Sequence, residues 1–242
     1  MNAILEPLKV NNLKETCIQR LEDLILSGEL IAGEKLPSER DLAMRLNISR
    51  PVLHEALVDL AAKGLVSILP RRGVVVNDYR RTGSCAILSS LLSYNNGQLD
   101  PQFIDSLFAM RVLVEVEAAA LAARHANREQ QAELREMIDI KRNFAGGEPQ
   151  SLTELDFDFH LLIAIASGNL VYPLILNSFK NVYTHFTGEF FRRCRDEHVI
   201  KEVFQFQTLL VEAIVNRDLS AAGDIMRSML IHGEKHLKGV LK

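Results

Sequence analysis

Two short β-type runs, 65–69 and 74–76, directly follow three helical patterns, and this order strongly constrains the fold of the chain. The runs are joined by residues 70–73, Pro-Arg-Arg-Gly, a sequence typical of a tight turn, so they predict a β-hairpin. Beyond a transition at residues 78–84 the sequence is almost wholly helical, with a break expected at residues 167–169 and one helix over 170–192 after it. We therefore expect a mainly α protein, in which three helices and a hairpin precede a larger all-helical bundle.

The helices before the hairpin are bounded by recognisable capping residues. Apolar residues recur with a helical period over 13–25, which predicts one amphipathic helix. Ser38 is expected to cap a second helix, with Asp41 at the reach-back position of a capping box. A third helix follows a short connection, with Ser49 or Asn47 as its cap. Three helices and a hairpin are the plan of a winged helix-turn-helix, a DNA-binding fold.

The charge balance alone does not indicate a nucleic-acid-binding protein. The net charge is −3, and residues 1–80 carry eleven basic and eleven acidic side chains. A DNA-binding surface must therefore depend on where individual residues lie on the third helix, the helix before it and the wing. We expect the following residues to bind DNA: Arg40, Arg45, Ser49, Arg50, Pro51, His54, Arg71, Arg72 and Gly73.

Length and composition fit two domains of ordinary size, which we place at 1–80 and 81–242. Apolar runs stay far below the ~20 residues that span a bilayer, so we expect no membrane partner. The three scattered cysteines are typical of reduced thiols in the cytoplasm. The sequence contains no nucleophile elbow, glycine-rich phosphate loop or HExxH motif, so an enzyme is not expected.

Several linked segments resemble a known family of DNA-binding proteins. Residues 31–43, 48–50, 55–57 and 64–66 together resemble the DNA-binding domain of GntR-family transcription regulators, and residues 73–76 are similar to the wing that ends it. The resemblance implies a sequence-specific regulator of transcription that binds double-stranded operator DNA.

The second half of the chain resembles the FadR subgroup of that family, on residues 111–115, 156–160 and 166–169. This resemblance implies a homodimer on a palindromic operator, with an all-helical domain that dimerises and binds a small-molecule effector. We expect it to act as a repressor. Residues 103–111 and 172–177 are similar to fatty-acid-responsive members, which implies a fatty acyl-CoA as the effector.

The resemblance places Arg111 and Tyr183 at positions that contact the effector. Arg111 lies in an apolar helix, and a buried arginine needs an anionic partner, which is either Glu115 one turn further on or the effector itself. Three phenylalanines follow Tyr183 and either pack in the core or line an acyl tunnel. They are Phe186, Phe190 and Phe191.

Asp156 and His160 lie four residues apart and therefore share one face of a helix. Many members of the subgroup bind a divalent metal with this pair and two later histidines, which the resemblance aligns with Gln207 and Met229 here. His232, one turn beyond Met229, is a possible replacement. The pair is therefore either structural or part of an effector site, and the second alternative includes a small carboxylate, such as a sugar acid, held with a divalent metal.

Two questions about the first domain stay open. His54 stands where the family usually has arginine, so it either keeps a phosphate contact or is simply exposed. A function of another class, a helical protein-interaction module without DNA binding, is also conceivable. Ser49, Arg50 and the two wing arginines favour DNA binding.

Overall fold

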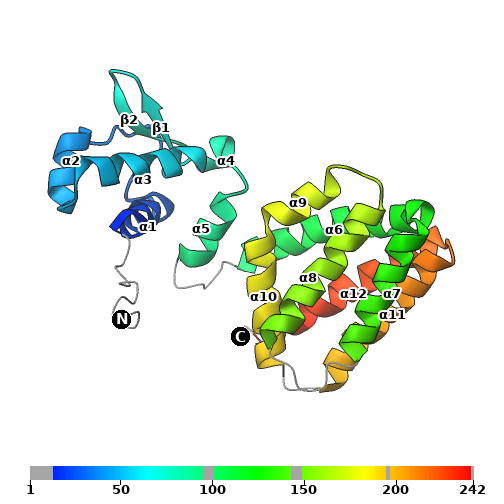
Figure 1. Cartoon of the computed structure of the whole chain (residues 1–242). Coiled ribbons are helices and arrows are strands. Elements are labelled where there is room, and N and C mark those ends of the chain that lie inside the picture. Colours follow the sequence, from blue (N-terminus) through cyan, green and yellow to red (C-terminus); the bar gives the residue numbers. More distant parts are fainter. Residues whose placement is uncertain (1–12, 95–100, 143–148, 195–196, 241–242) are drawn as a thin grey trace, which may run out of the picture. The chain divides into compact units, whose positions relative to one another are not determined.

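The computed structural model of the chain shows helices and one two-stranded antiparallel sheet, as expected of a mainly α protein (Figure 1). The structure describes residues 13–94, 101–142, 149–194 and 197–240. The chain divides into two compact units, Met1–Leu99 and Asp100–Lys242. Within the described ranges, every helix is too short or too polar to cross a lipid bilayer.

The first unit contains the helices and the hairpin that the sequence predicts. Its elements are α1 (Leu13–Leu26), α2 (Glu39–Leu46), α3 (Arg50–Ala62), β1 (Val66–Leu69), β2 (Gly73–Val76), α4 (Tyr79–Thr82) and α5 (Ile87–Ser93). Ser38 caps α2, because its hydroxyl accepts a hydrogen bond from the Asp41 backbone N–H and donates one to the Asp41 carboxylate at 2.7 Å. Ser49 caps α3 by accepting from the Val52 N–H. Asn47 instead ends α2, in a left-handed conformation with φ 52°.

Strand β2 is bonded along both of its edges. On one side β1 pairs with it antiparallel, with Val66 opposite Val76. On the other side the segment that precedes α2 lies against it: the Leu36 N–H donates to the Val74 carbonyl, and the Val76 N–H donates to the Glu34 carbonyl, each at 2.9 Å. The hairpin is therefore tied to the segment that leads into the helix-turn-helix and does not hang free.

Residues 81–94 pack on the first unit. Ile87 of α5 is part of its hydrophobic core. A polar cluster joins α1, the end of α3 and α5: the Lys63 ammonium lies 2.5 Å from the Glu22 carboxylate and donates to the Ser90 hydroxyl at 2.9 Å, and Ser90 donates to Glu22 at 2.8 Å. The first compact unit therefore extends past the boundary at 80/81 that the sequence suggests. The residues of this polar cluster are far apart in the sequence and meet only in the folded chain, so no local pattern indicates that α5 belongs to the first unit.

The second unit consists of helices, and one of them differs from expectation. The elements are α6 (Pro101–His125), α7 (Arg128–Arg142), α8 (Pro149–Ala166), α9 (Tyr172–Ser178), α10 (Lys180–Arg193), α11 (Glu197–Val215) and α12 (Leu219–Val240). The sequence predicts a single helix over 170–192, which is wrong, because the chain breaks at Phe179 (φ −119°, ψ 21°). The Phe179 side chain is buried, and the helical period continues across the break without glycine or proline, so the pattern carries no signal of it.

Helix α6 is central to the packing of this unit. It packs against α8, α11 and α12, and α11 also contacts α7 and α12. In its last two turns, the residues that α6 contributes to the hydrophobic core are alanines, whose small side chains let neighbouring helices approach closely. These are Ala119, Ala122 and Ala123, with Ala126 just after the helix. Larger side chains from the surrounding helices fill the core between them, among them Phe159, Leu210, Ile214 and Met226.

Gly64 provides a test of how the segment after the hairpin docks on α3. It has φ 80°, and a Cβ there would lie 2.1 Å from the Thr82 carbonyl oxygen. We expect Gly64→Ala to destabilise the first unit by more than about 2 kcal/mol, because backbone strain adds to the steric overlap. Hydrogen–deuterium exchange of amides in residues 13–94 measures this loss locally.

Gly28→Ala is the matched control. Gly28 has φ 81°, but a Cβ there meets nothing within 4 Å. This variant should lose only about 1 kcal/mol of stability, from the backbone strain of a side chain at positive φ. Equal losses in the two variants would contradict the close approach of Thr82 to Gly64.

Candidate functional site

Exposed arginines mark one candidate surface on the first unit. Arg50 is the first residue of α3, with Pro51 at the start of the helix and the capping Ser49 before it. All three are exposed, so the N-terminal end of α3 is open to a partner. Backbone N–H groups at such a helix end favour a phosphate. The arginines of α2 and of the hairpin are exposed as well: Arg40, Arg45, Arg71 and Arg72.

The tip of the hairpin holds an arginine in an uncommon conformation. The Arg72 N–H donates to the Leu69 carbonyl at 3.0 Å, which closes a turn with Pro70 second and Arg71 third. Arg71 has φ 61°, where glycine or asparagine is usual, at a cost of about 1–2 kcal/mol. Gly73 follows with φ 92°. The turn thus keeps a cationic side chain at the tip despite its conformational cost.

His54 of α3 is exposed and lies beside an acidic residue of α2. Its Nδ1 atom is 3.2 Å from Oε1 of Glu39. Arg40 likewise lies 3.5 Å from the Asp41 carboxylate, but its side chain is 79% exposed. In this structure His54 therefore faces a carboxylate, and Arg50 is the basic side chain at the start of α3.

The second candidate site is a cavity of about 70 Å³ inside the second unit. The four residues that the sequence suggests as effector contacts, Arg111, Asp156, His160 and Tyr183, all line it. Gln207 and Met229 line it too. Its remaining wall is largely apolar and includes Phe108, Phe186, Phe190, Phe191, Val203 and Leu237. Folding thus brings together residues from α6, α8, α10, α11 and α12.

A buried ion pair forms one side of the cavity. The Arg111 guanidinium donates to Glu115 with Nε 2.6 Å from Oε1, and its charge lies 4.3 Å from the centre of the Tyr183 ring. His160 Nδ1 lies 2.5 Å from the other oxygen of Glu115. Burial alone would raise the pKa of Glu115, but Arg111 and His160 lower that pKa to about 2. The intrachain partner of Arg111 is therefore Glu115, and the guanidinium still borders the cavity.

Asp156 is held by a second set of polar groups. The Tyr183 hydroxyl donates to Oδ2 at 2.8 Å, and the Gln207 amide donates to Oδ1 at 2.7 Å. Lys141 lies 3.6 Å from Oδ1 and donates to Gln207 Oε1 at 2.9 Å. Burial opposes ionisation of Asp156, yet its pKa is lowered, chiefly by Lys141. Burial lowers the pKa of Lys141 and raises that of Tyr183.

These bonds do not fit a divalent metal at Asp156 and His160. Both Asp156 oxygens already accept hydrogen bonds, one from Tyr183 and one from Gln207. Lys141 supplies a positive charge beside Asp156, where a dication would be repelled. Neither Gln207 nor Met229 offers an imidazole.

His232 does not line the cavity, so it does not replace the missing ligand at Met229.

Lys141 is the residue of this site that the sequence did not suggest. It lies seven residues after Leu134 and three after Ile138, both buried, and so continues the apolar stripe of α7. A lysine at such a position predicts either a helix edge or a buried charge. Its side chain is 2% exposed, so Lys141 is a buried charge.

Comparison with known proteins finds a matching protein family for each of the two units. Residues 13–76 match the family model described as bacterial regulatory proteins, gntR family, and residues 106–232 match the FCD domain. The chain belongs to the GntR family. It is thus a DNA-binding transcription regulator with a C-terminal effector domain, and the families and relatives that it matches are regulators and not enzymes.

Named relatives of this GntR-family regulator include the HTH-type transcriptional regulator Mce2R of Mycobacterium tuberculosis, which is 32% identical over 74% of this chain and 73% of its own. YcbG of Bacillus subtilis is 28% identical over 88% of this chain and 87% of its own. The fatty acid metabolism regulator protein of Erwinia tasmaniensis is 31% identical over 66% of this chain and 64% of its own.

Among solved structures, Lar of Listeria monocytogenes matches with a TM-score of 0.63 at 19% identity, over 96% of this chain and 99% of that chain. This match supports the shared fold.

The ion pair predicts how acid affects the second unit. The pKa of Glu115 falls from an ordinary 4.5 to about 2 on folding. The stability that this carboxylate contributes to the folded state is therefore fully present above pH 4.5 and is lost as the pH falls towards 2. The contribution is on the order of 3 kcal/mol. We expect Glu115→Gln to unfold more easily at pH 7 and to lose less stability between pH 5 and pH 2.5, as measured by urea unfolding followed by circular dichroism.

Glu117→Gln serves as the control, because Glu117 is an exposed carboxylate on the same helix. Its pH dependence should match that of the unaltered chain. Parallel pH profiles for Glu115→Gln and the unaltered chain would rule out the low pKa.

Proposed function

We propose that this regulator is a homodimeric repressor that binds a palindromic operator and responds to an acyl-type effector bound in the cavity of the second unit. The observation that carries the proposal is the cavity itself. It lies within the region that matches the FCD domain, and it combines a buried guanidinium with a wall of phenylalanines. Such a combination suits a ligand with a polar oxygen at one end and an apolar body.

For operator binding we propose that α3 enters the major groove and that the wing reaches the backbone or the minor groove. The exposed N-terminal end of α3 supports this, because an α-helix fits the width of the major groove. The strained, exposed Arg71 supports a role for the wing. Such a surface binds through contacts between its arginines and the phosphates of DNA, so its affinity for DNA falls as the salt concentration rises. This salt dependence distinguishes it from a module that binds another protein.

The dimer is supported by large apolar side chains that the second unit leaves exposed. Leu113 is 77% exposed, Leu170 is 85% and Leu174 is 67%. Contact with a second copy would remove such surface from water. A two-fold dimer would also present two α3 helices to the two halves of a palindrome.

Arg50→Ala tests the DNA-binding surface. We expect a loss of specific operator affinity of more than tenfold, because each direct base contact contributes about 1–3 kcal/mol. The measurement is fluorescence anisotropy with an operator obtained by selection from genomic DNA. Arg128→Ala removes an equal charge from an exposed position in the second unit and should leave affinity unchanged. Unaltered affinity of Arg50→Ala would count against the docking of α3.

The lining of the cavity supports an acyl-type effector. Arg111 and Tyr183 would face a carboxylate or thioester oxygen, and the phenylalanines of α10 would contact the acyl chain. Relatives named fatty acid metabolism regulators support this class. The lysine beside Asp156 disfavours an effector that is bound through a metal.

The size of the cavity suggests how binding would reach the DNA-binding unit. Sites for drug-sized ligands usually measure about 300–1,000 Å³, several times the 70 Å³ found here. A fatty acyl chain therefore requires the helices that enclose the cavity to move apart. This movement supplies the two conformations between which a ligand shifts the population, and with it the affinity for operator.

The same small volume favours a second candidate, a short carboxylate bound at Arg111 without a metal. Thermal-shift measurements with palmitoyl-CoA, octanoyl-CoA, free CoA and gluconate separate the two candidates. We expect the melting temperature to rise with acyl chain length and to be unaffected by free CoA. A shift with gluconate alone would favour the second candidate.

Gly233→Leu blocks the cavity without removing any polar contact. Gly233 lines the cavity, and a Cβ there meets nothing within 4 Å. We expect this variant to fold and to lose both the thermal shift and the release of operator by palmitoyl-CoA. Gly239→Leu is the matched control, on the same helix, equally open and outside the cavity lining. An undiminished response of Gly233→Leu would place the effector elsewhere.

A further inference from the structure

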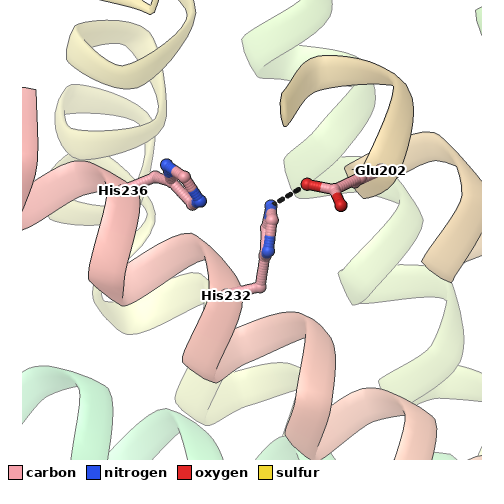
Figure 2. Close-up of side chains that lie close together, drawn as sticks. All are labelled: Glu202, His232 and His236. Atoms are coloured by element: carbon pink, nitrogen blue, oxygen red, sulfur yellow. Dashed lines mark ion pairs between the residues drawn. The ribbon is translucent and has the colours of Figure 1, made fainter. Parts of the chain in front are cut away.

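Outside the cavity, three potential metal ligands gather between α11 and α12. His232 and His236 are one turn apart on α12, and Glu202 of α11 faces them (Figure 2). Each offers one ligand atom, and the three atoms lie within 4.8 Å of one another. Among the described residues, this is the group of three or more His, Cys, Asp or Glu side chains whose ligand atoms lie close enough together to hold one metal ion.

The imidazole of His232 is not satisfied by the ion pair that it forms. Its Nε2 lies 3.7 Å from Oε2 of Glu202, too far for a hydrogen bond, and this buried atom finds no hydrogen-bond partner among the described residues. Burial and the neighbouring His236 lower the pKa of His232, which favours the neutral ring. A neutral imidazole is the form that binds a metal, whereas a buried nitrogen left without a partner is unfavourable.

We propose that Glu202, His232 and His236 form a binding site for a divalent transition metal of the Zn²⁺ type. Two imidazoles and one carboxylate are a ligand set that Zn²⁺ accepts, with water completing a tetrahedron. Ligand atoms about 2.0–2.1 Å from the metal are about 3.3 Å apart, so the three side chains need to close in by about 1.5 Å at most. The histidine spacing of i, i+4 directs both rings to one side of α12.

The surroundings allow a cation to enter. The Glu202 side chain is 40% exposed, and the ring of His232 packs against Phe206, which holds it towards Glu202. The nearby Lys238 is engaged by Glu234 and Asp105, so its charge is balanced. His198, one turn before Glu202, lies 3.7 Å from its other carboxylate oxygen and adds a further imidazole at the entrance.

The site would act on the cavity through the helices that they share. Val203 follows Glu202, and Gly233 follows His232, and both of these neighbours line the cavity. A bound metal joins α11 to α12 at this level, and so restrains two of the helices that enclose the cavity. The site is separate from Asp156 and His160, whose groups are already hydrogen-bonded.

Zinc binding to the whole 242-residue chain, stripped of metal with a chelator and without DNA, tests the proposal. Equilibrium dialysis against Zn²⁺ with elemental analysis should give about one ion per chain. His236→Gln and Glu202→Gln should each weaken binding by more than about tenfold, since even the partners of metal ligands contribute that much. Co²⁺ bound in place of Zn²⁺ should show the intense visible absorption of a tetrahedral site in the unaltered chain and not in His236→Gln or Glu202→Gln.

His125→Gln is the matched control, because it removes an exposed imidazole from the end of α6 and should not change zinc binding. Melting in EDTA should be the same for the unaltered chain, His236→Gln, Glu202→Gln and His125→Gln. Of these four, added Zn²⁺ should raise the melting temperature of the unaltered chain and of His125→Gln alone. Absence of stoichiometric binding, or normal binding by His236→Gln and Glu202→Gln, would overturn the proposal. So would loss of binding in His160→Gln, which would assign the metal to the cavity.

Discussion

The second unit depends on buried charges that are balanced by partners from several different helices. Asp156 on α8 accepts hydrogen bonds from Tyr183 on α10 and Gln207 on α11, and it lies beside Lys141 on α7. Arg111 on α6 stacks against the ring of the same tyrosine. Loss of one partner would leave an uncompensated charge in an apolar interior, which is costlier than never having buried the pair. A ligand that contacts Arg111 or Tyr183 therefore acts on the same bonds that hold the helices together.

The first unit solves a different electrostatic problem. Its basic and acidic residues are equal in number over residues 1–80, so no excess of charge attracts DNA. Instead, caps and turns determine where charge is displayed: Ser49 starts α3 directly before Arg50, and a left-handed turn carries Arg71 at the hairpin tip. Bonding of β2 on both edges holds that tip relative to α2 and α3. Affinity for DNA then depends on local geometry more than on net charge.

Much of this architecture is predictable because its signals are local. The cap at Ser38, the hairpin turn and the breaks around Gly168 each depend on a few adjacent residues, and the structure contains all of them. No pattern along the chain reports the break at Phe179, and the apolar stripe that Lys141 continues leaves a helix edge and a buried charge equally open until packing with distant helices decides. The candidate effector residues are predictable as a set from family resemblance, whereas their mutual hydrogen bonds, and the pairing of Glu202 with His232, emerge only from the tertiary fold.

The small volume of the cavity has a consequence for the timing of the proposed response. Under the proposed function, a ligand larger than about 70 Å³ would enter only while the helices around the cavity are separated. At high ligand concentration the rate of association then stops rising and equals the rate of opening. Departure would need the same motion, so release of the ligand would lag behind a fall in its supply. The regulator would thereby average over brief fluctuations in metabolite level and retain a short record of past abundance.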